Sequence, residues 1–296
     1  MRAFSAGVHL AGIGCRGHCF ALAVFERFTV IRSIETLSPG NAKRLQGIFF
    51  DIDDTFTTNG RIGGRAFQSL WDLKDAGLRV VPITGRPAGW CDHIARMWPV
   101  DGVVGENGAF YFCYDEEKRT LAKRFLAGED LRKRNRLRLE KIKEEIVASV
   151  PGAATASDQL YREADLAIDY CEDVPPLPWE EVEKICRIFR SHGAECKVSS
   201  IHVNGWFGDY DKLSMTRIFV RERWRLELDS NKEEFLFCGD SPNDEPMFRF
   251  FPLSAGVNNV LRFTPRMKHL PSFVAEREGS EGFAEIVETV LRKRSS

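Results

Sequence analysis

Short apolar runs alternate with amphipathic stretches in the first part of the chain. Residues 47–50 and 78–83 are apolar runs of strand length, whereas residues 64–76 and 88–98 place apolar side chains at helical spacing. Strands that alternate with helices in this way form parallel sheets in α/β folds. The pattern therefore predicts a doubly wound parallel sheet. Further short strands are expected at residues 100–104 and 109–112.

The middle of the chain alternates at a different rhythm, with Pro and Gly between its segments, and the first rhythm returns at Leu236. We therefore predict a second, smaller α/β unit, residues 113–208, inserted into a core made of residues 44–112 and 209–296. The expected elements of this unit are helices at residues 131–150 and 179–191 and strands at residues 165–170 and 196–204.

The first 43 residues differ from the rest in composition. They contain no acidic residue before Glu26 and have scattered Arg side chains among apolar residues. A transit-like leader and a start codon placed too far upstream both fit this pattern. We expect residues 1–43 to be an appendage, so that the folded core begins near Arg44.

Composition excludes several classes of partner. Of the 296 residues 43% are hydrophobic, enough for a packed core, and 42 Lys plus Arg nearly balance 43 Asp plus Glu. The overall charge thus favours neither a nucleic acid nor an anionic membrane, and charges interrupt the apolar stretch 3–23 too often for a membrane span. Eight cysteines without a CxxC pair are typical of free thiols in a reducing compartment, so we expect a cytoplasmic protein.

The segment "FFDIDDTFTTNG", residues 49–60, runs an apolar strand directly into the carboxylates of Asp51, Asp53 and Asp54. In parallel α/β sheets, ligands bind beyond the carboxyl ends of the strands. Other segments bring further polar side chains to this edge. They are Thr84-Gly85-Arg86, "GDSPND" at residues 239–244, and Lys212 at the start of the predicted helix that precedes the "GDSPND" strand.

Gathered at one edge, these side chains suit phosphoryl transfer. Carboxylates such as Asp51 and Asp240 are ligands that Mg²⁺ prefers, and the cation would offset their repulsion. Asp51 would then attack phosphorus as a nucleophile, while Asp53 would protonate the leaving alcohol and activate water. Thr84 and Lys212 would orient the non-bridging phosphate oxygens.

The segments "DIDDT", "ITGRP", "DK" and "GDSPND" resemble, in this order, the four motifs of the haloacid dehalogenase superfamily of Mg²⁺-dependent phosphohydrolases. "TGRP" and "GENGA", with an insertion between the second and third motifs, resemble its Cof-like branch, subfamily IIB. That branch includes sucrose-phosphate, trehalose-phosphate and mannosyl-phosphoglycerate phosphatases. The resemblance implies a phosphatase core and an inserted cap that closes over the substrate.

The resemblance also implies a role for each matching residue. Asp51 would be the nucleophile and Asp53 the acid/base, and Thr84 and Lys212 would clamp the phosphate. Lys212 is followed by Leu where relatives commonly have Gly, so Lys197 is a weaker alternative. The expected metal ligands are Asp51, Asp53, Asp240 and Asp244. The expected substrate-binding residues of the core are Thr84, Gly85, Arg86, Lys212 and Asn243.

Two charged residues near the motifs, Asp54 and Arg86, each have two possible interpretations. Asp54 is better explained as a turn or helix-cap acid than as a metal ligand. Arg86 either lines the phosphate pocket or is an ordinary surface residue.

The predicted strand at residues 196–204 places Ser200, His202 and Asn204 on one face. If helices of the inserted unit cover the apolar face, the polar face looks toward the active site. His202 and Asn204, with Asp169 on the neighbouring strand, would then recognise substrate hydroxyls. The alternative is a polar sheet edge that faces solvent.

The features together predict a Mg²⁺-dependent phosphatase that hydrolyses a phosphomonoester of a sugar or related polyol, a small-molecule partner. A phosphosugar mutase would use the same four motifs. A phospho-accepting signalling domain is a second alternative, but it would need neither "GDSPND" nor a long insertion. A catalytically silent binding protein is a third, and it would be expected to lack Asp51 or Asp53.

Overall fold

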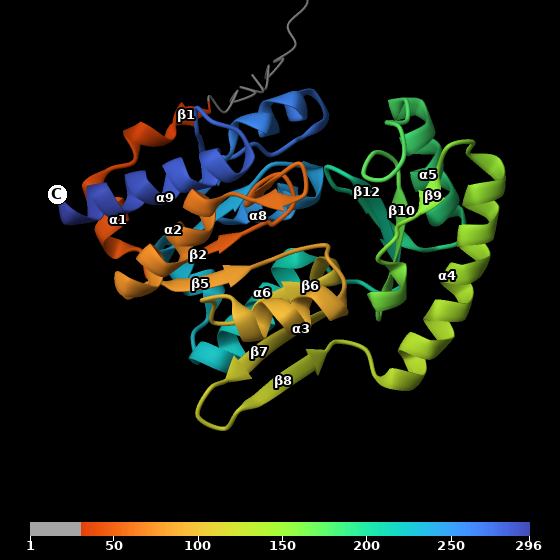
Figure 1. Cartoon of the computed structure of the whole chain (residues 1–296), viewed down its shortest axis with the longest axis horizontal. Helices are drawn as coiled ribbons and strands as arrows, with labels where there is room; N and C mark the ends of the chain where they lie inside the picture. The colour runs from red at the N-terminus through yellow and green to blue at the C-terminus, as the bar shows by residue number, and fades with distance from the viewer. Residues whose placement is uncertain (1–30) are drawn as a thin grey trace, which may run out of the picture.

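The computed structural model describes residues 31–296, and a six-stranded sheet forms the centre of the core (Figure 1). All neighbouring strands in this sheet run parallel, so the predicted α/β core is confirmed. From one edge to the other, the strands are β1 (Arg32–Ser33), β15 (Phe273–Val274), β14 (Leu253–Gly256), β13 (Phe235–Gly239), β2 (Gly47–Phe50) and β5 (Arg79–Pro82).

Helices cover both faces of this sheet. On one face lie α1 (Pro39–Arg44), α2 (Gly64–Asp75) and α9 (Gly279–Ser295), and on the other α6 (Lys212–Phe219) and α8 (Glu245–Phe250). In β2, Ile48 and Phe50 pack on the first face and Phe49 on the second. The apolar run of this strand is continuous because both of its faces are buried.

Residues 32–44 belong to the packed core, although the sequence pattern grouped them with the leader. β1 pairs with β15, and Ile34, Leu37 and Ala42 are buried in the cluster that includes α9. Glu35 forms an ion pair with Arg292 of α9. The packed core therefore includes residues before Arg44. The rest of the predicted leader, residues 1–30, lies outside the described residues.

An antiparallel sheet extends the core beyond β5. It contains β6 (Val103–Gly105), β7 (Phe110–Asp115) and β8 (Thr120–Phe125), and α3 (Ala88–Met97) packs against it. Residue 113, the expected boundary of the insertion, thus falls inside β7. β8 was not expected because its residues are polar and largely exposed. We propose that the insertion begins after β8.

Residues 129–206, called the cap below, form a separate small α/β layer. Its antiparallel sheet has the order β11 (Glu195–Val198), β12 (His202–Trp206), β10 (Asp165–Asp169) and β9 (Ala154–Thr155). The helices α4 (Glu129–Ser149) and α5 (Trp179–Ser191) cover the sheet face away from the core (Figure 1). The single strand expected at residues 196–204 is wrong. It is a hairpin, because the Ser199 hydroxyl accepts the N–H of His202 at 3.0 Å and turns the chain.

Within residues 31–296, no helix has both the length and the apolar character needed to cross a membrane. The six cysteines of this part of the chain are all free.

Candidate active site

Three strand ends meet because β2 lies in register between β5 and β13. Phe50 at the end of β2 pairs with Pro82 of β5 and with Cys238 of β13. The Asp51 N–H donates to the Cys238 carbonyl at 2.9 Å. The polar residues that follow these strands, Asp51, Thr84 and Asp240, therefore lie at one edge of the sheet.

Lys212 is the centre of a buried charge cluster. Its Nζ donates to Asp51 Oδ1 at 2.8 Å and to Asp244 Oδ1 at 2.7 Å. Asp51, Asp240 and Asp244 are all buried, and each offers a carboxylate oxygen within 4.8 Å of the others. One ammonium group thus faces three carboxylates, which leaves their negative charge only partly compensated.

This cluster fits a divalent cation. Burial raises the pKa of Asp51 to about 8, an effect that Lys212 opposes and the charges of Asp244 and Asp53 reinforce. Burial also raises the pKa of Asp240, and the neighbouring carboxylates add to the shift. Carboxylate oxygens are the ligands that Mg²⁺ prefers, and two positive charges would offset this repulsion. Asp53, the fourth predicted ligand, lies outside the cluster.

The loop at residues 239–244 is shaped around Asp244. A Cβ on Gly239 would lie 2.4 Å from Asp244 Oδ2, so only glycine fits there. The same oxygen accepts the Asp240 N–H at 3.0 Å. Asp240 in turn accepts hydrogen bonds from Thr55 Oγ1 and Asn259 Nδ2, both at 3.2 Å. Sequence reasoning missed Asn259, although its place just after the apolar run of β14 is the signal that marked the other site residues.

The start of α6 presents Lys212 to the cluster. Asp211 caps the helix and accepts the Ser214 N–H at 2.7 Å. Gly108 of "GENGA" packs directly on this turn, since a Cβ there would lie 2.1 Å from the Asp211 carbonyl oxygen. Lys197, the alternative lysine, lines a cavity of about 620 Å³ whose lining does not include Asp51. The geometry thus favours Lys212 over Lys197 as the partner of Asp51.

Arg86 holds the side chain of Asp53. Its Nε and Nη2 donate to Asp53 Oδ1 at 2.9 and 2.8 Å, and both side chains are largely buried. Thr84 is fully buried, and its Oγ1 accepts the Arg86 N–H at 3.0 Å. Gly85 leaves space for Asn107, whose Nδ2 would be 3.1 Å from a Cβ at that position. Arg86 is therefore buried beside Asp53 rather than exposed at the surface.

β12 brings two cap residues to the core. His202 and Asn204 are each 2% exposed. With Asp51, Asp53 and Asn243 they line a small cavity, the inner chamber, of about 10 Å³. This volume is too small for a phosphoryl group, so the structure has the cap closed and substrate entry requires the cap to move.

A second cavity of about 440 Å³, the outer chamber, adjoins the inner one. The two chambers share Asp53, Arg86 and Ile201 in their linings. The outer chamber also has Asp54, Glu172, Asp173 and Ser200 in its wall.

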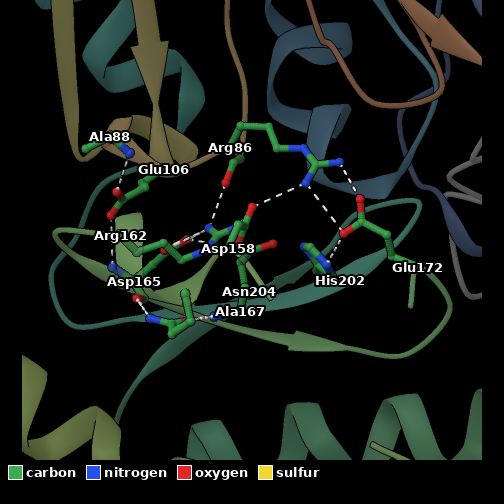
Figure 2. A network of polar contacts seen from close by, with 12 residues as sticks. Arg86, Ala88, Glu106, Asp158, Arg162, Asp165, Ala167, Glu172, His202 and Asn204 are labelled. Carbon is green, nitrogen blue, oxygen red and sulfur yellow. Dashed lines mark hydrogen bonds and ion pairs between the residues drawn. The ribbon is translucent and has the colours of Figure 1, made fainter. Parts of the chain in front are cut away.

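Ion pairs connect the cap with the core around the buried Arg86 side chain (Figure 2). Arg86 Nη2 donates to Glu172 Oε1 at 2.6 Å, and its Nη1 donates to Asp158 Oδ2 at 3.2 Å. Arg162 pairs with Asp158 and donates from Nη1 to the Gly85 carbonyl at 2.8 Å. Glu172, Asp158 and Arg162 were not predicted as site residues.

Glu106 of "GENGA" also joins the two layers (Figure 2). Its buried carboxylate accepts the N–H of Ala88 at 3.0 Å, at the start of α3. It also accepts the cap N–H groups of Glu163, Ala164 and Asp165 at 2.8, 2.6 and 3.1 Å. The sequence signal for this residue was a charge placed directly after the apolar run of β6.

Residues 48–163 match the model of the haloacid dehalogenase-like hydrolase family. The matched segment contains "DIDDT", "ITGRP" and "GENGA". Over this segment the chain is similar to the haloacid dehalogenase-like hydrolases. The resemblance inferred from the motifs is thus confirmed.

Among curated proteins, the phosphoglycolate phosphatase of Methanoculleus marisnigri is 24% identical to this hydrolase over 247 residues. The match covers 82% of this chain and 95% of that protein.

Solved structures share the fold of this hydrolase. Thermoplasma acidophilum 0175 has a TM-score of 0.62 at 22% identity, covering 83% of this chain and 98% of the other. The trehalose-6-phosphate phosphatase C-terminal domain of C. albicans has 0.64 at 16%, covering 90% and 99%. The sucrose-phosphatase of Synechocystis, in complex with sucrose and phosphate, has 0.56 at 15%, covering 84% and 98%. At these identities the similarity is one of fold alone.

Proposed function

We propose that this hydrolase cleaves phosphomonoesters with the help of Mg²⁺, through a phosphorylated Asp51, and that its substrate is a sugar or polyol phosphate. The observation that carries this proposal is the surroundings of Asp51. The carboxylate is buried at the end of β2, with Lys212 Nζ at 2.8 Å and Asp240 and Asp244 beside it. A carboxylate nucleophile, a cation for the phosphate and metal-binding carboxylates are the parts that phosphoryl transfer to an aspartate needs.

The proposed reaction has two steps. In the first, an Asp51 oxygen bonds to phosphorus, the bond from phosphorus to the leaving oxygen breaks, and Asp53 gives that oxygen a proton. In the second, Asp53 takes a proton from water, the water oxygen bonds to phosphorus, and the bond to Asp51 breaks to release phosphate. Lys212 and Thr84 would hold the non-bridging oxygens throughout. Mg²⁺ held by Asp51, Asp240 and Asp244 would neutralise charge on the phosphoryl group.

Two observations support a sugar or polyol phosphate. The outer chamber, which adjoins Asp53, is lined by the carboxylates of Glu172 and Asp173 and the hydroxyl of Ser200, side chains that suit hydroxyl groups. Two of the similar structures are sugar-phosphate phosphatases by name. We further propose that this small molecule is the only partner the reaction needs, and that the free thiols reflect a reducing compartment, the cytoplasm.

The test is phosphate release from sugar phosphates, disaccharide phosphates and phosphoglycolate, with Mg²⁺ or with a chelator. We expect a preferred sugar or polyol phosphate, no release in chelator and none from Asp51→Asn. Asp75→Asn, which changes an exposed carboxylate of α2, is the matched control and should retain activity. Release that persists in chelator would refute the metal role. A rearranged sugar phosphate would indicate a mutase, and a stable phosphoprotein without release would indicate a signalling domain.

A further inference from the structure

Glu172 reaches the site from the cap, although the two steps above do not use it. We propose that Glu172 selects the leaving group: it accepts hydrogen bonds from the hydroxyls of a neutral polyol and excludes phosphomonoesters whose leaving group carries an anion. This inference rests on the proposed phosphatase function and makes its substrate class more specific.

The backbone around Glu172 is fixed in place. Asp169, at the end of β10, is 1% exposed, and its Oδ1 accepts the N–H groups of Cys171 and Glu172 at 2.9 and 2.8 Å. Its Oδ2 accepts the Asp173 N–H at 2.8 Å. Asp169, which the sequence suggested as a substrate-binding residue, is thus engaged in holding the segment that carries Glu172.

The carboxylate of Glu172 is fixed as well (Figure 2). Arg86 Nη2 lies 2.6 Å from its Oε1, and His202 Nε2 lies 2.8 Å from its Oε2. Partial burial raises the pKa of Glu172, but the nearby His202 ring and Arg86 guanidinium outweigh it and lower the pKa to about 2. Because the group is ionised in any ordinary buffer, it accepts hydrogen bonds and donates none.

The rest of the outer chamber has the same character. Its charged wall consists of four carboxylates, those of Asp53, Asp54, Glu172 and Asp173, against the single guanidinium of Arg86. Arg86 is already shared between Asp53 and Glu172. The buried Oγ of Ser200, also in this wall, has no hydrogen-bond partner among the described residues. A ligand here therefore meets mostly negative charge, which favours hydroxyl donors and would repel a second anion.

The position of the outer chamber identifies the part of the substrate it would hold. In the proposed reaction phosphorus lies beside Asp51, so the inner chamber must widen to hold it, and Asp53 lies in the lining that the two chambers share. The group bonded to the leaving oxygen would therefore extend into the outer chamber. Its volume of about 440 Å³ is within the range of small-molecule sites.

The experiment compares kcat/KM of the wild type and Glu172→Gln for two matched substrates, glycerol 3-phosphate and 3-phosphoglycerate. They share a carbon skeleton and differ by a hydroxymethyl group against a carboxylate. The leaving group of p-nitrophenyl phosphate has neither a hydroxymethyl group nor a carboxylate, so its hydrolysis reports on phosphoryl transfer alone. Glu180→Gln, an exposed glutamate of α5, is the matched control variant.

We expect the wild type to prefer glycerol 3-phosphate. Glu172→Gln should lower kcat/KM for glycerol 3-phosphate by about tenfold, because a hydrogen bond to a charged group is lost. The same substitution should raise kcat/KM for 3-phosphoglycerate by about tenfold, because the charge repulsion is removed. Hydrolysis of p-nitrophenyl phosphate should change by less than about twofold. The Glu180→Gln variant should match the wild type throughout.

Two results would overturn the selection by Glu172 while leaving the phosphatase intact. One is a wild-type preference for 3-phosphoglycerate, and the other is an equal loss on all three substrates in Glu172→Gln, which would mean that Glu172 only supports the fold. Failure of the wild type to hydrolyse any of the three substrates would instead refute the phosphatase function itself, and the inference with it.

Discussion

At the scale of single residues, Lys212 is the cation within the buried carboxylate cluster. It is 1% exposed and binds two of three clustered carboxylates. Burial lowers its pKa, but Asp244 and Asp51 outweigh this and raise it above the ordinary value, so the group stays charged. The same charge that offsets Asp51 and Asp244 would bind phosphate oxygens during the reaction.

Substitution of Lys212 tests this double role. Lys212→Met should lower the unfolding free energy of the metal-free protein by about 3 kcal/mol, because it leaves buried carboxylates without a cation. It should also lower kcat by about 100-fold or more. Denaturant unfolding in chelator and phosphate release measure the two effects. Lys197→Met is the matched control, and equal effects of both substitutions would contradict the assignment.

The ion pairs of Glu172 predict a dependence of stability on pH. The ordinary pKa of 4.5 falls to about 2 in the folded protein, so Glu172 stabilises the fold above pH 4.5 and loses this contribution as the pH falls toward 2. Wild type should exceed Glu172→Gln by about 1 kcal/mol at pH 7, allowing for solvent screening, and the gap should close toward pH 3. Urea unfolding across this range measures it. A gap that widens in acid would contradict the assigned ion pairs.

The residues at the strand ends could be predicted from the sequence. Each follows an apolar run, and the α/β pattern implies that these runs are strands of one parallel sheet. Asp51, Thr84 and Asp240 come together for this reason. Glu172 and Arg162 carry no such signal, since their contacts with Arg86 and Gly85 depend on how the cap packs against the core. Asp53 was predicted as a metal ligand, and nothing in its sequence context showed that Arg86 would bind it.

At the scale of elements, the segment before β2 differs most from the prediction made from the sequence. Ile34 and Leu37 are 0% and 1% exposed, and α1 packs on α9. A boundary near Arg44 was expected because the alternating pattern becomes regular only after it. The segment instead covers one edge of the sheet and one face of α9.

Shortening the chain tests this packing. A chain that begins at residue 44 should lose about 4 kcal/mol or more of unfolding free energy relative to one that begins at residue 31, because two large buried side chains are removed. Chemical denaturation of both chains measures the difference. Equal stabilities would contradict the placement of residues 32–44 in the core.

Strongly periodic elements were predicted well, and polar ones were not. α5 spans Trp179–Ser191 as expected, since its apolar residues recur at helical spacing and Pro178 precedes it. β8 has no buried residue, so its pairing with β7 leaves no apolar pattern to read. The hairpin of β11 and β12 was read as one strand because its turn contains neither Gly nor Pro.

At the scale of the whole molecule, the cap and the core meet around the reacting groups. Glu106, Arg86 and Arg162 each bind atoms of both layers. These contacts close the inner chamber to about 10 Å³. In the proposed reaction, substrate entry would require the cap to separate from the core and return, which would break and remake the ion pairs of Arg86.

Metal binding should stabilise the whole molecule. Mg²⁺ at about 100 times its dissociation constant should add nearly 3 kcal/mol and raise Tm by about 5 °C, because it binds the folded carboxylate cluster. Asp240→Asn should abolish most of this shift, whereas Asp75→Asn should keep it. Thermal unfolding with Mg²⁺ and with chelator measures it. An equal shift in all three proteins would place the metal elsewhere.

The central claim, a covalent phosphoryl intermediate on Asp51, is tested most directly by trapping it. Asp53→Asn removes the group that activates water, while p-nitrophenyl phosphate has a leaving group that needs no proton. Acid quenching of this variant after mixing with p-nitrophenyl phosphate and Mg²⁺, followed by peptide mass analysis, should find a phosphoryl group on Asp51. Its absence during continued turnover, or a phosphoryl group on another residue, would contradict the account.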